Sequence, residues 1–229
     1  MIPRHEIRVG QQKTQFGYEN LESSKRLYAV NRTEVSDNLS RGPTLRDIGV
    51  GLVGNIKLGN GFRIEDGATV VNGAGMNVQA DDTSRKSFWG RLGVRYKNDD
   101  LGDLEVRLGG SGGIGDFKEL EDPALDTDDF RLSFKSIGSD LEVDQEWFFV
   151  STEVVAGWTD DVTKDEQDQV TGYYVNLVGK TPWHLGPITR YDMLGDEFRR
   201  WTFGNNVPAF SMAFRSLTSL SGPGCITKY

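Results

Sequence analysis

Alternation of apolar and polar side chains is the feature that most restricts what this chain can fold into. In residues 88–108, Leu92 and Val94 fall on one parity, and Arg91 and Arg95 fall on the other. Successive side chains of a β-strand point to opposite faces, so this stretch predicts a hairpin with one apolar and one charged face. The apolar face of a soluble sheet is buried. The apolar face of a membrane barrel meets lipid, and its charged face lines the lumen.

Similar segments recur along the whole chain and predict an all-β, antiparallel, up-and-down sheet, curved as a transmembrane β-barrel or a segment of one. Eleven strands are expected, at 4–15, 44–58, 62–72, 87–97, 104–113, 129–137, 141–157, 171–181, 185–193, 198–205 and 208–218. Most approach the 9–11 residues or so that a tilted strand needs to cross a bilayer. Almost no helix is expected outside residues 17–43. The positions expected to face lipid are Leu92, Val94, Tyr96, Leu104, Val106, Leu108, Phe130, Leu132 and Phe134.

The linkers between these segments alternate in length. Long linkers are expected at 16–43, 73–86, 114–128 and 158–170, and short turns at 59–61, 98–103, 138–140 and 181–184. In an up-and-down sheet, every second connection lies at the same end. One end would therefore carry long loops and the other short turns, as in bacterial outer-membrane barrels. A soluble sandwich has no reason to sort its loops in this way.

Composition excludes several classes of protein. The 229 residues suit a single domain (1–229), and the net charge of −8 argues against wholesale nucleic-acid binding. No apolar run is long enough for a transmembrane helix, and the first ten residues lack the apolar core of a signal peptide. Cys225 is the only cysteine, which excludes an intrachain disulfide.

No arrangement of residues predicts catalysis. The two histidines, His5 and His184, belong to no HExxH motif, and the chain has no CxxC or GxSxG. The acidic stretches 119–129 and 159–169 lack the spacing of a calcium loop. We therefore expect neither enzymatic activity nor a cofactor, and a surface hydrolase is the weakest of the functions considered.

Basic residues recur on the polar parity of several strands. They are Arg91, Arg95, Arg107, Arg131 and Lys135. Such residues form either the solvated outer face of a soluble sheet or a positive strip that draws anions into a pore. The pattern alone leaves both interpretations open. Glu105, Glu142 and Glu146 share the polar face and reduce the expected anion selectivity.

Several stretches together resemble the phosphate-selective porin O and P family. They are IRVGQQKTQFGYENLESSKRLYAVNR (7–32), RDIGVGLVG (46–54), VVNGAGMN (70–77), KSFWGRLGVRY (86–96) and GPITRYDMLGDEFRRWTFGNN (186–206). The resemblance covers roughly residues 5–207, in the family's order. It implies a sixteen-stranded barrel in the bacterial outer membrane, possible homotrimers, and a loop at 16–43 that folds inward as a constriction. The chain departs from the family at Gln15, in its lower strand number, and in the terminal residues 222–224. The family's signal peptide and first strands have no counterpart in this sequence, so residues 1–229 are expected to be part of one porin barrel domain, a fragment lacking the N-terminal part.

The resemblance favours the interpretation in which the charged face of the sheet lines the lumen of a barrel. The expected function is then passive diffusion of small anions such as phosphate, with outer-membrane lipid as the surroundings and no nucleic-acid partner. The cations expected along the path are Lys25, Arg26, Arg32, Arg41, Arg46, Arg91, Arg95, Arg107 and Arg131. Glu19, Glu22 and Glu34 in the same loop would weaken selectivity. The alternative is a soluble or periplasmic β-sandwich or lipocalin-like protein that binds a ligand.

Overall fold

The computed structural model contains one antiparallel sheet of ten strands in sequence order. The described residues are 4–29, 32–39, 46–77, 86–118, 131–161, 166–181, 185–195 and 209–216. The strands are β1 (His5–Lys13), β2 (Arg46–Gly59), β3 (Phe62–Val71), β4 (Ser87–Asn98), β5 (Leu104–Lys118), β6 (Arg131–Asp144), β7 (Phe148–Asp161), β8 (Glu166–Gly179), β9 (Leu185–Gly195) and β10 (Ala209–Ser216). Each strand pairs with the next, which confirms the predicted all-β, up-and-down topology.

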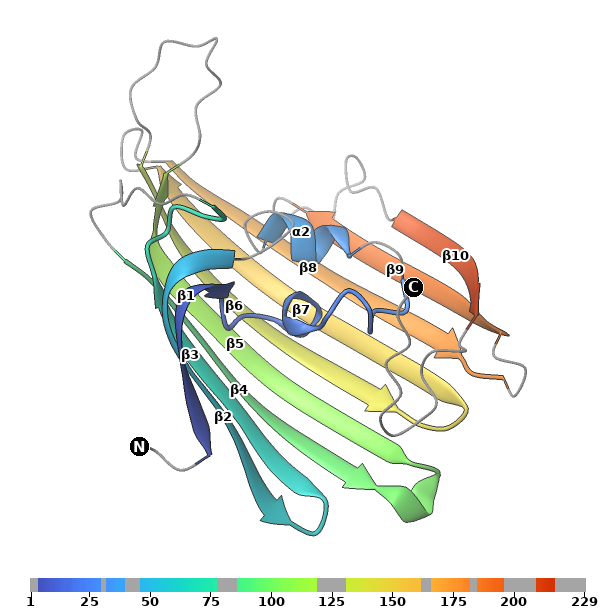
Figure 1. The fold of residues 1–229 in the computed structure, drawn as a ribbon. Helices are drawn as coiled ribbons and strands as arrows, with labels where there is room; N and C mark the ends of the chain where they lie inside the picture. The colour runs from blue at the N-terminus through green and yellow to red at the C-terminus, as the bar shows by residue number, and fades with distance from the viewer. Residues whose placement is uncertain are drawn as a thin grey trace.

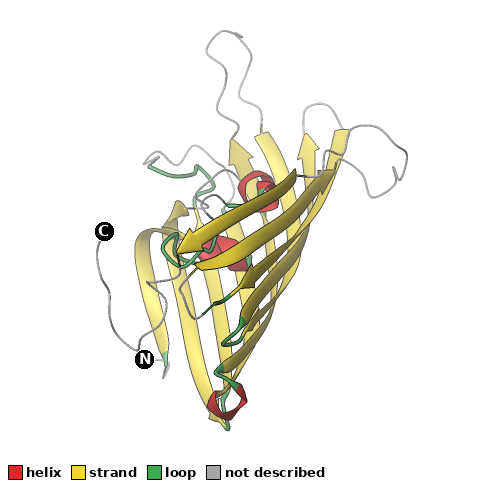
Figure 2. Ribbon diagram, turned by 90° about the vertical axis from the view of Figure 1, so that its right-hand side faces the viewer, coloured by secondary structure: helices red, strands yellow, loops and turns green. Residues whose placement is uncertain are grey.

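The sheet curves into a trough but does not close (Figures 1 and 2). β1 pairs only with β2, and β10 pairs only with β9, so both are edge strands in the described part of the chain. The strand count is lower than the eleven expected. Ten of the expected segments overlap strands, and the remaining one, 198–205, lies outside the described residues.

Two short helices lie on the concave side of the trough (Figures 1 and 2). They are α1 (Tyr18–Leu21) and α2 (Glu34–Leu39), and α2 packs against β7, β8 and β9. A single 3-10 turn, η1 (Asp99–Leu101), joins β4 to β5 at the short-turn end. Within the described residues, α-helix is thus confined to 17–43, as expected.

The turn expected at 138–140 is wrong. Gly138 and Asp140 lie inside β6, and the chain reverses at 145–147, where Gln145 N donates to Phe148 O at 2.9 Å. Glycine followed by Ser-Asp is typical of a turn, but here the small residue serves packing. A Cβ at Gly138 would lie 3.3 Å from Cζ of Phe16, which belongs to the loop between β1 and β2.

The face expected for Phe134 is also wrong. Its side chain is buried on the concave side and stacks on Trp89, with ring centroids 4.9 Å apart. Lys135 points outward instead, and its side chain is exposed. The alternation at 130–135 is inverted because aromatic side chains are needed inside the trough, where they hold the loop. Phe130 and the side chain of Leu132 lie outside the described residues.

The other six positions expected on the apolar face lie on the convex side of the sheet. Leu92, Val94 and Leu108 are exposed there, and Tyr96, Leu104 and Val106 are half-buried. The expected acidic linker at 158–170 is shorter than predicted, because most of its residues belong to the paired ends of β7 and β8. The short connections nevertheless share one end of the sheet, as the alternation of linker length predicted (Figure 1).

The inward and outward faces of β5 can be tested at two adjacent glycines. A Cβ at Gly113 would lie 2.2 Å from the Trp89 ring, whereas the nearest atom to a Cβ at Gly112 is 3.8 Å away. We expect Gly113→Ala to lower the free energy of unfolding by about 1–3 kcal/mol, the usual cost of overpacking. Gly112→Ala should leave it within about 0.5 kcal/mol of the wild type. Urea unfolding in detergent measures both, and equal losses would contradict the assignment of faces.

Candidate functional site: the concave face and its loop

The segment that follows β1 crosses the concave face and is fastened to it at two places on the wall. At β5, Gly17 N donates to Oγ of Ser111 at 3.0 Å. Phe16 is fully buried and meets Trp89 edge to face, with centroids 5.3 Å apart. Aromatic contacts of this kind add to the free energy gained by burial, so Phe16 anchors the start of the loop.

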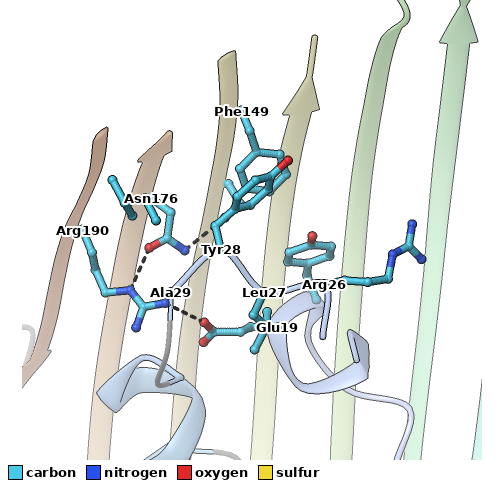
Figure 3. A pocket seen from close by; sticks show the side chains of 11 residues that line it. Glu19, Arg26, Leu27, Tyr28, Ala29, Phe149, Asn176 and Arg190 are labelled. Atoms are coloured by element: carbon cyan, nitrogen blue, oxygen red, sulfur yellow. Dashed lines mark hydrogen bonds and ion pairs between the residues drawn. The ribbon is translucent and has the colours of Figure 1, made fainter. Parts of the chain in front are cut away.

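Two residues beyond Gly17, the loop is held by a second buried group, the carboxylate of Glu19, whose side chain is 1% exposed. Glu19 accepts hydrogen bonds from Arg190 Nη2 at 3.0 Å and from Thr33 N and Oγ1 at 2.9 and 2.6 Å. Burial raises the pKa of Glu19, and the bond to Thr33 and the charge of Arg190 oppose that rise. Figure 3 shows this ion pair together with Asn176, which accepts from Arg190 Nε. The loop is therefore tied to β9, on the other side of the trough.

The space between loop and wall is almost filled at this point. Leu27 and Tyr28 of the loop face the wall, and the Tyr28 ring lies 4.5 Å from the Phe149 ring (Figure 3). Burial raises the pKa of Tyr28. The cavity left beside Glu19 and Arg190 has a volume of about 10 Å³, enough for one water molecule at most. It cannot hold an organic ligand.

Two of the arginines expected to line a pore, both on β4, are paired with carboxylates of other strands. Both guanidinium Nη atoms of Arg91 bind Asp140, one of them at 2.7 Å, and Nη1 also donates to Ser111 Oγ. Arg95 pairs with Glu105 and lies 3.6 Å from Glu65. These pairs keep the charges compensated on the concave face.

Arg107 is the centre of a larger charged cluster. Its guanidinium lies 3.1 Å from Glu22 in the loop, 3.1 Å from Glu105 and 3.7 Å from Glu142. Three carboxylates surround one guanidinium, so the cluster as a whole is acidic. Burial raises the pKa of the neighbouring Tyr18, and the charges of Glu142 and Glu22 raise it further. Arg107 thus fastens the loop rather than presenting a free positive charge.

The loop cations differ in their surroundings. Lys25 is exposed, and Arg26 is 63% exposed and only 3.7 Å from Glu22. Arg32 instead turns back onto the loop, where it donates to the carbonyls of Glu19 and, at 3.2 Å, Glu22. Lys25 and Arg26 can therefore meet solutes, whereas Arg32 holds the backbone of the loop.

Arg46, the first residue of β2, is exposed and lies in register with Lys13, whose Nζ donates to the loop carbonyls of Asn20 and Glu22 at 2.7 and 2.8 Å. Arg41 lies outside the described residues, as does the side chain of Arg131, the first residue of β6.

Two further basic residues on the concave face were absent from the predicted set. Lys57 and Arg63 are paired in register with each other, and Arg63 is followed across the sheet by Arg95 and Arg107. Lys57 is exposed and Arg63 half-buried, and no hydrogen bond or ion pair engages either side chain in the described part of the chain. The polar parity of Lys57 in its strand is the sequence signal that could have identified them.

Within the described ranges, no group of histidine, cysteine and acidic residues could hold a metal ion. None of the helices described is long and apolar enough to cross a membrane. Comparison with protein-family models, with curated proteins and with solved structures gives no match to this chain.

The loop anchor predicts unequal effects of two arginine substitutions. Arg190→Gln leaves the Glu19 carboxylate buried without its cation, and we expect it to cost about 3–5 kcal/mol of unfolding free energy. Arg26→Gln removes a weak, exposed pair and should change stability by less than about 1 kcal/mol. Urea unfolding measures these effects, and protease cleavage between residues 14 and 39 reports release of the loop. Equal resistance of the two variants to cleavage would contradict the anchoring role.

The pKa of Glu19 predicts how anchoring depends on pH. An acid whose pKa is raised in the folded state stabilises that state below its ordinary pKa of 4.5, and the contribution is lost as pH rises through the folded pKa. The free energy of unfolding should therefore fall more steeply with rising pH above 4.5 in the wild type than in Glu19→Gln. The difference between the two slopes isolates Glu19 from the other titrating groups, and identical slopes would refute the prediction.

Proposed function

We propose that the chain forms the wall and constriction loop of an outer-membrane porin, through which small solutes diffuse with a preference for anions such as phosphate. One observation carries the proposal. The convex side of the sheet is apolar and exposed, whereas the charged side is concave and covered by the chain's own loop (Figure 2). A soluble sheet would have the opposite arrangement.

The apolar surface is too extensive for a protein surrounded by water. The exposed members of the convex face on β1 to β5 include Ile7, Val9, Val50, Val70, Phe88, Leu92, Val94, Leu108 and Ile114. Apolar patches on soluble monomers seldom exceed about 300–600 Å². Removing apolar area from water contributes about 25 cal/mol per Å², and lipid around the convex face would provide that gain.

The ends of β7 carry aromatic residues on the outward parity. Phe148 begins the strand, and Trp158 lies about ten residues further on. At about 3.3 Å per residue and a tilt of about 40°, these rings would be about 25 Å apart across the membrane, the height of a barrel's apolar band. Trp147, exposed at the adjoining turn, extends the aromatic group at the short-turn end.

The proposal requires that the two edges of the sheet be paired. Unpaired backbone groups in lipid cost several kcal/mol each. The exposed edges of β1 and β10 must therefore pair with further strands in the membrane.

The distribution of charge supports a preference for anions, but through other residues than first expected. The acids Glu19, Asp140 and Glu153 are buried beneath the loop. The exposed charges include Lys25 and Lys57, with Arg63 half-buried beside Lys57. These basic groups attract anions over the screening distance of about 10 Å, and the exposed acids Glu6 and Glu34 act against them. The resemblance to the phosphate-selective porin family points the same way.

A lipocalin-like binder has less support. Such a protein needs an enclosed apolar cavity of about 300 Å³ or more. The cavity under the loop is about 10 Å³.

Planar-bilayer recordings test both parts of the proposal. The wild type should form open channels whose reversal potential in a potassium chloride gradient indicates anion preference. Lys57→Gln combined with Arg63→Gln should shift that potential toward cations, because neither charge is paired within the described residues and both lie on the concave face. Lys135→Gln removes a charge from the convex face and should leave the potential unchanged. Absence of channels would refute the porin, and an unshifted potential in the double variant would refute the role of Lys57 and Arg63.

A further inference from the structure

The convex face contains a groove that the packing of the protein does not explain. Two adjoining hollows of about 790 and 630 Å³ lie over β3 to β7, and both include Gly90 and Ile137 in their lining. Their walls are apolar side chains of the outward parity, among them Leu92, Ile114 and Val154. Both hollows are shallow and widely open on their outer side.

The floor of the groove consists of glycines that nothing inside the protein requires. Cβ atoms at Gly90, Gly110 and Gly112 would meet no atom closer than 3.8 Å. By contrast, a Cβ at Gly109 or Gly113, on the inward face of the same strand β5, would lie within 2.3 Å of Arg91 or Trp89. The inward glycines make room for buried side chains. The outward glycines weaken the strand and make no room for a side chain inside the protein. The space that they leave is open to a molecule on the convex side of the wall.

A single cation stands at the end of the groove nearest the long loops. Lys135 lines one hollow, in register with Ile114 on β5 and with Trp158 on β7. Its side chain is exposed, and no hydrogen bond or ion pair engages its ammonium in the described part of the chain. Asp116 and Asp160, one step nearer the loops, both have interactions of their own. The groove therefore joins an apolar trench to an unsatisfied positive charge beside a tryptophan.

We propose that this groove binds one membrane phospholipid, with an acyl chain over Gly90, Gly110 and Gly112 and the headgroup phosphate at Lys135. This rests on the proposed function, because the convex face must lie in a membrane. An ammonium beside a tryptophan at the end of an apolar surface is the arrangement that the interface of a bilayer favours. A second copy of the chain fits less well, since it would have to bring a free carboxylate to Lys135. The outward acids of β3, β5 and β7 that could do so, Asp66, Asp116 and Asp160, are already engaged.

Native mass spectrometry of the full chain in a neutral detergent tests the proposal, with dioleoylphosphatidylglycerol and dioleoylglycerol as probes. The wild type should retain one phosphatidylglycerol, about tenfold more tightly than dioleoylglycerol, which lacks the phosphate. Lys135→Gln should abolish that difference. Gly112→Leu places a side chain on the floor of the groove, where its Cβ would meet no atom closer than 3.8 Å, and should weaken both lipids about tenfold. Lys57→Gln, on the concave face, and Val175→Leu, on the convex face of β8, are the controls and should bind as the wild type does.

Any of three results would contradict lipid binding in the groove. In the first, the wild type, Lys135→Gln and Gly112→Leu retain phosphatidylglycerol equally. In the second, the wild type binds the two lipids equally, and in the third, the protein forms a lipid-free oligomer that Gly112→Leu dissociates. The last result would make a second copy the occupant. Channel recordings separate this proposal from the porin itself. If the protein forms channels but does not retain phosphatidylglycerol selectively, only the proposed lipid site is refuted. If it retains the lipid selectively but forms no channels, only the porin function is refuted.

Discussion

The compensation of charge on the concave face is the constraint on which the rest of the structure depends. Arginines that are buried on the concave face need a carboxylate partner to avoid a large energetic penalty. Arg91 on β4 finds Asp140 on β6, but Arg107 and Arg190 draw carboxylates from the loop. The loop is thus held across the sheet by the wall's own charges, and its apolar residues then fill the remaining space.

This arrangement separates two roles that a basic residue can have in such a wall. A paired, buried arginine fixes geometry and contributes little field, because its partner cancels its charge. An unpaired, exposed lysine contributes field but fixes nothing. Arg107 belongs to the first kind and Lys57 to the second. Selectivity in a narrow path therefore need not follow the number of arginines on its wall.

The two faces of β5 show how one strand can meet two different demands. Its inward glycines accommodate Trp89 and Arg91, whose bulk supports the loop. Its outward glycines create a groove in a surface that is otherwise ridged by leucine, isoleucine and valine. The two sets alternate along the strand, so the same substitution has unequal effects on stability at neighbouring positions.

The sequence by itself determined the strand order, most strand positions, the sorting of long and short connections, and the polar parity of Arg91, Arg95 and Arg107. These follow from a local rule, since alternate side chains of a strand face opposite sides. Only the tertiary structure decided the inward face of Phe134, the continuation of β6 through Gly138, and the pairing of Glu19 with Arg190. Each depends on a loop distant in sequence that packs against the wall. Periodicity records which residues share a face, but it cannot record which distant segment covers that face.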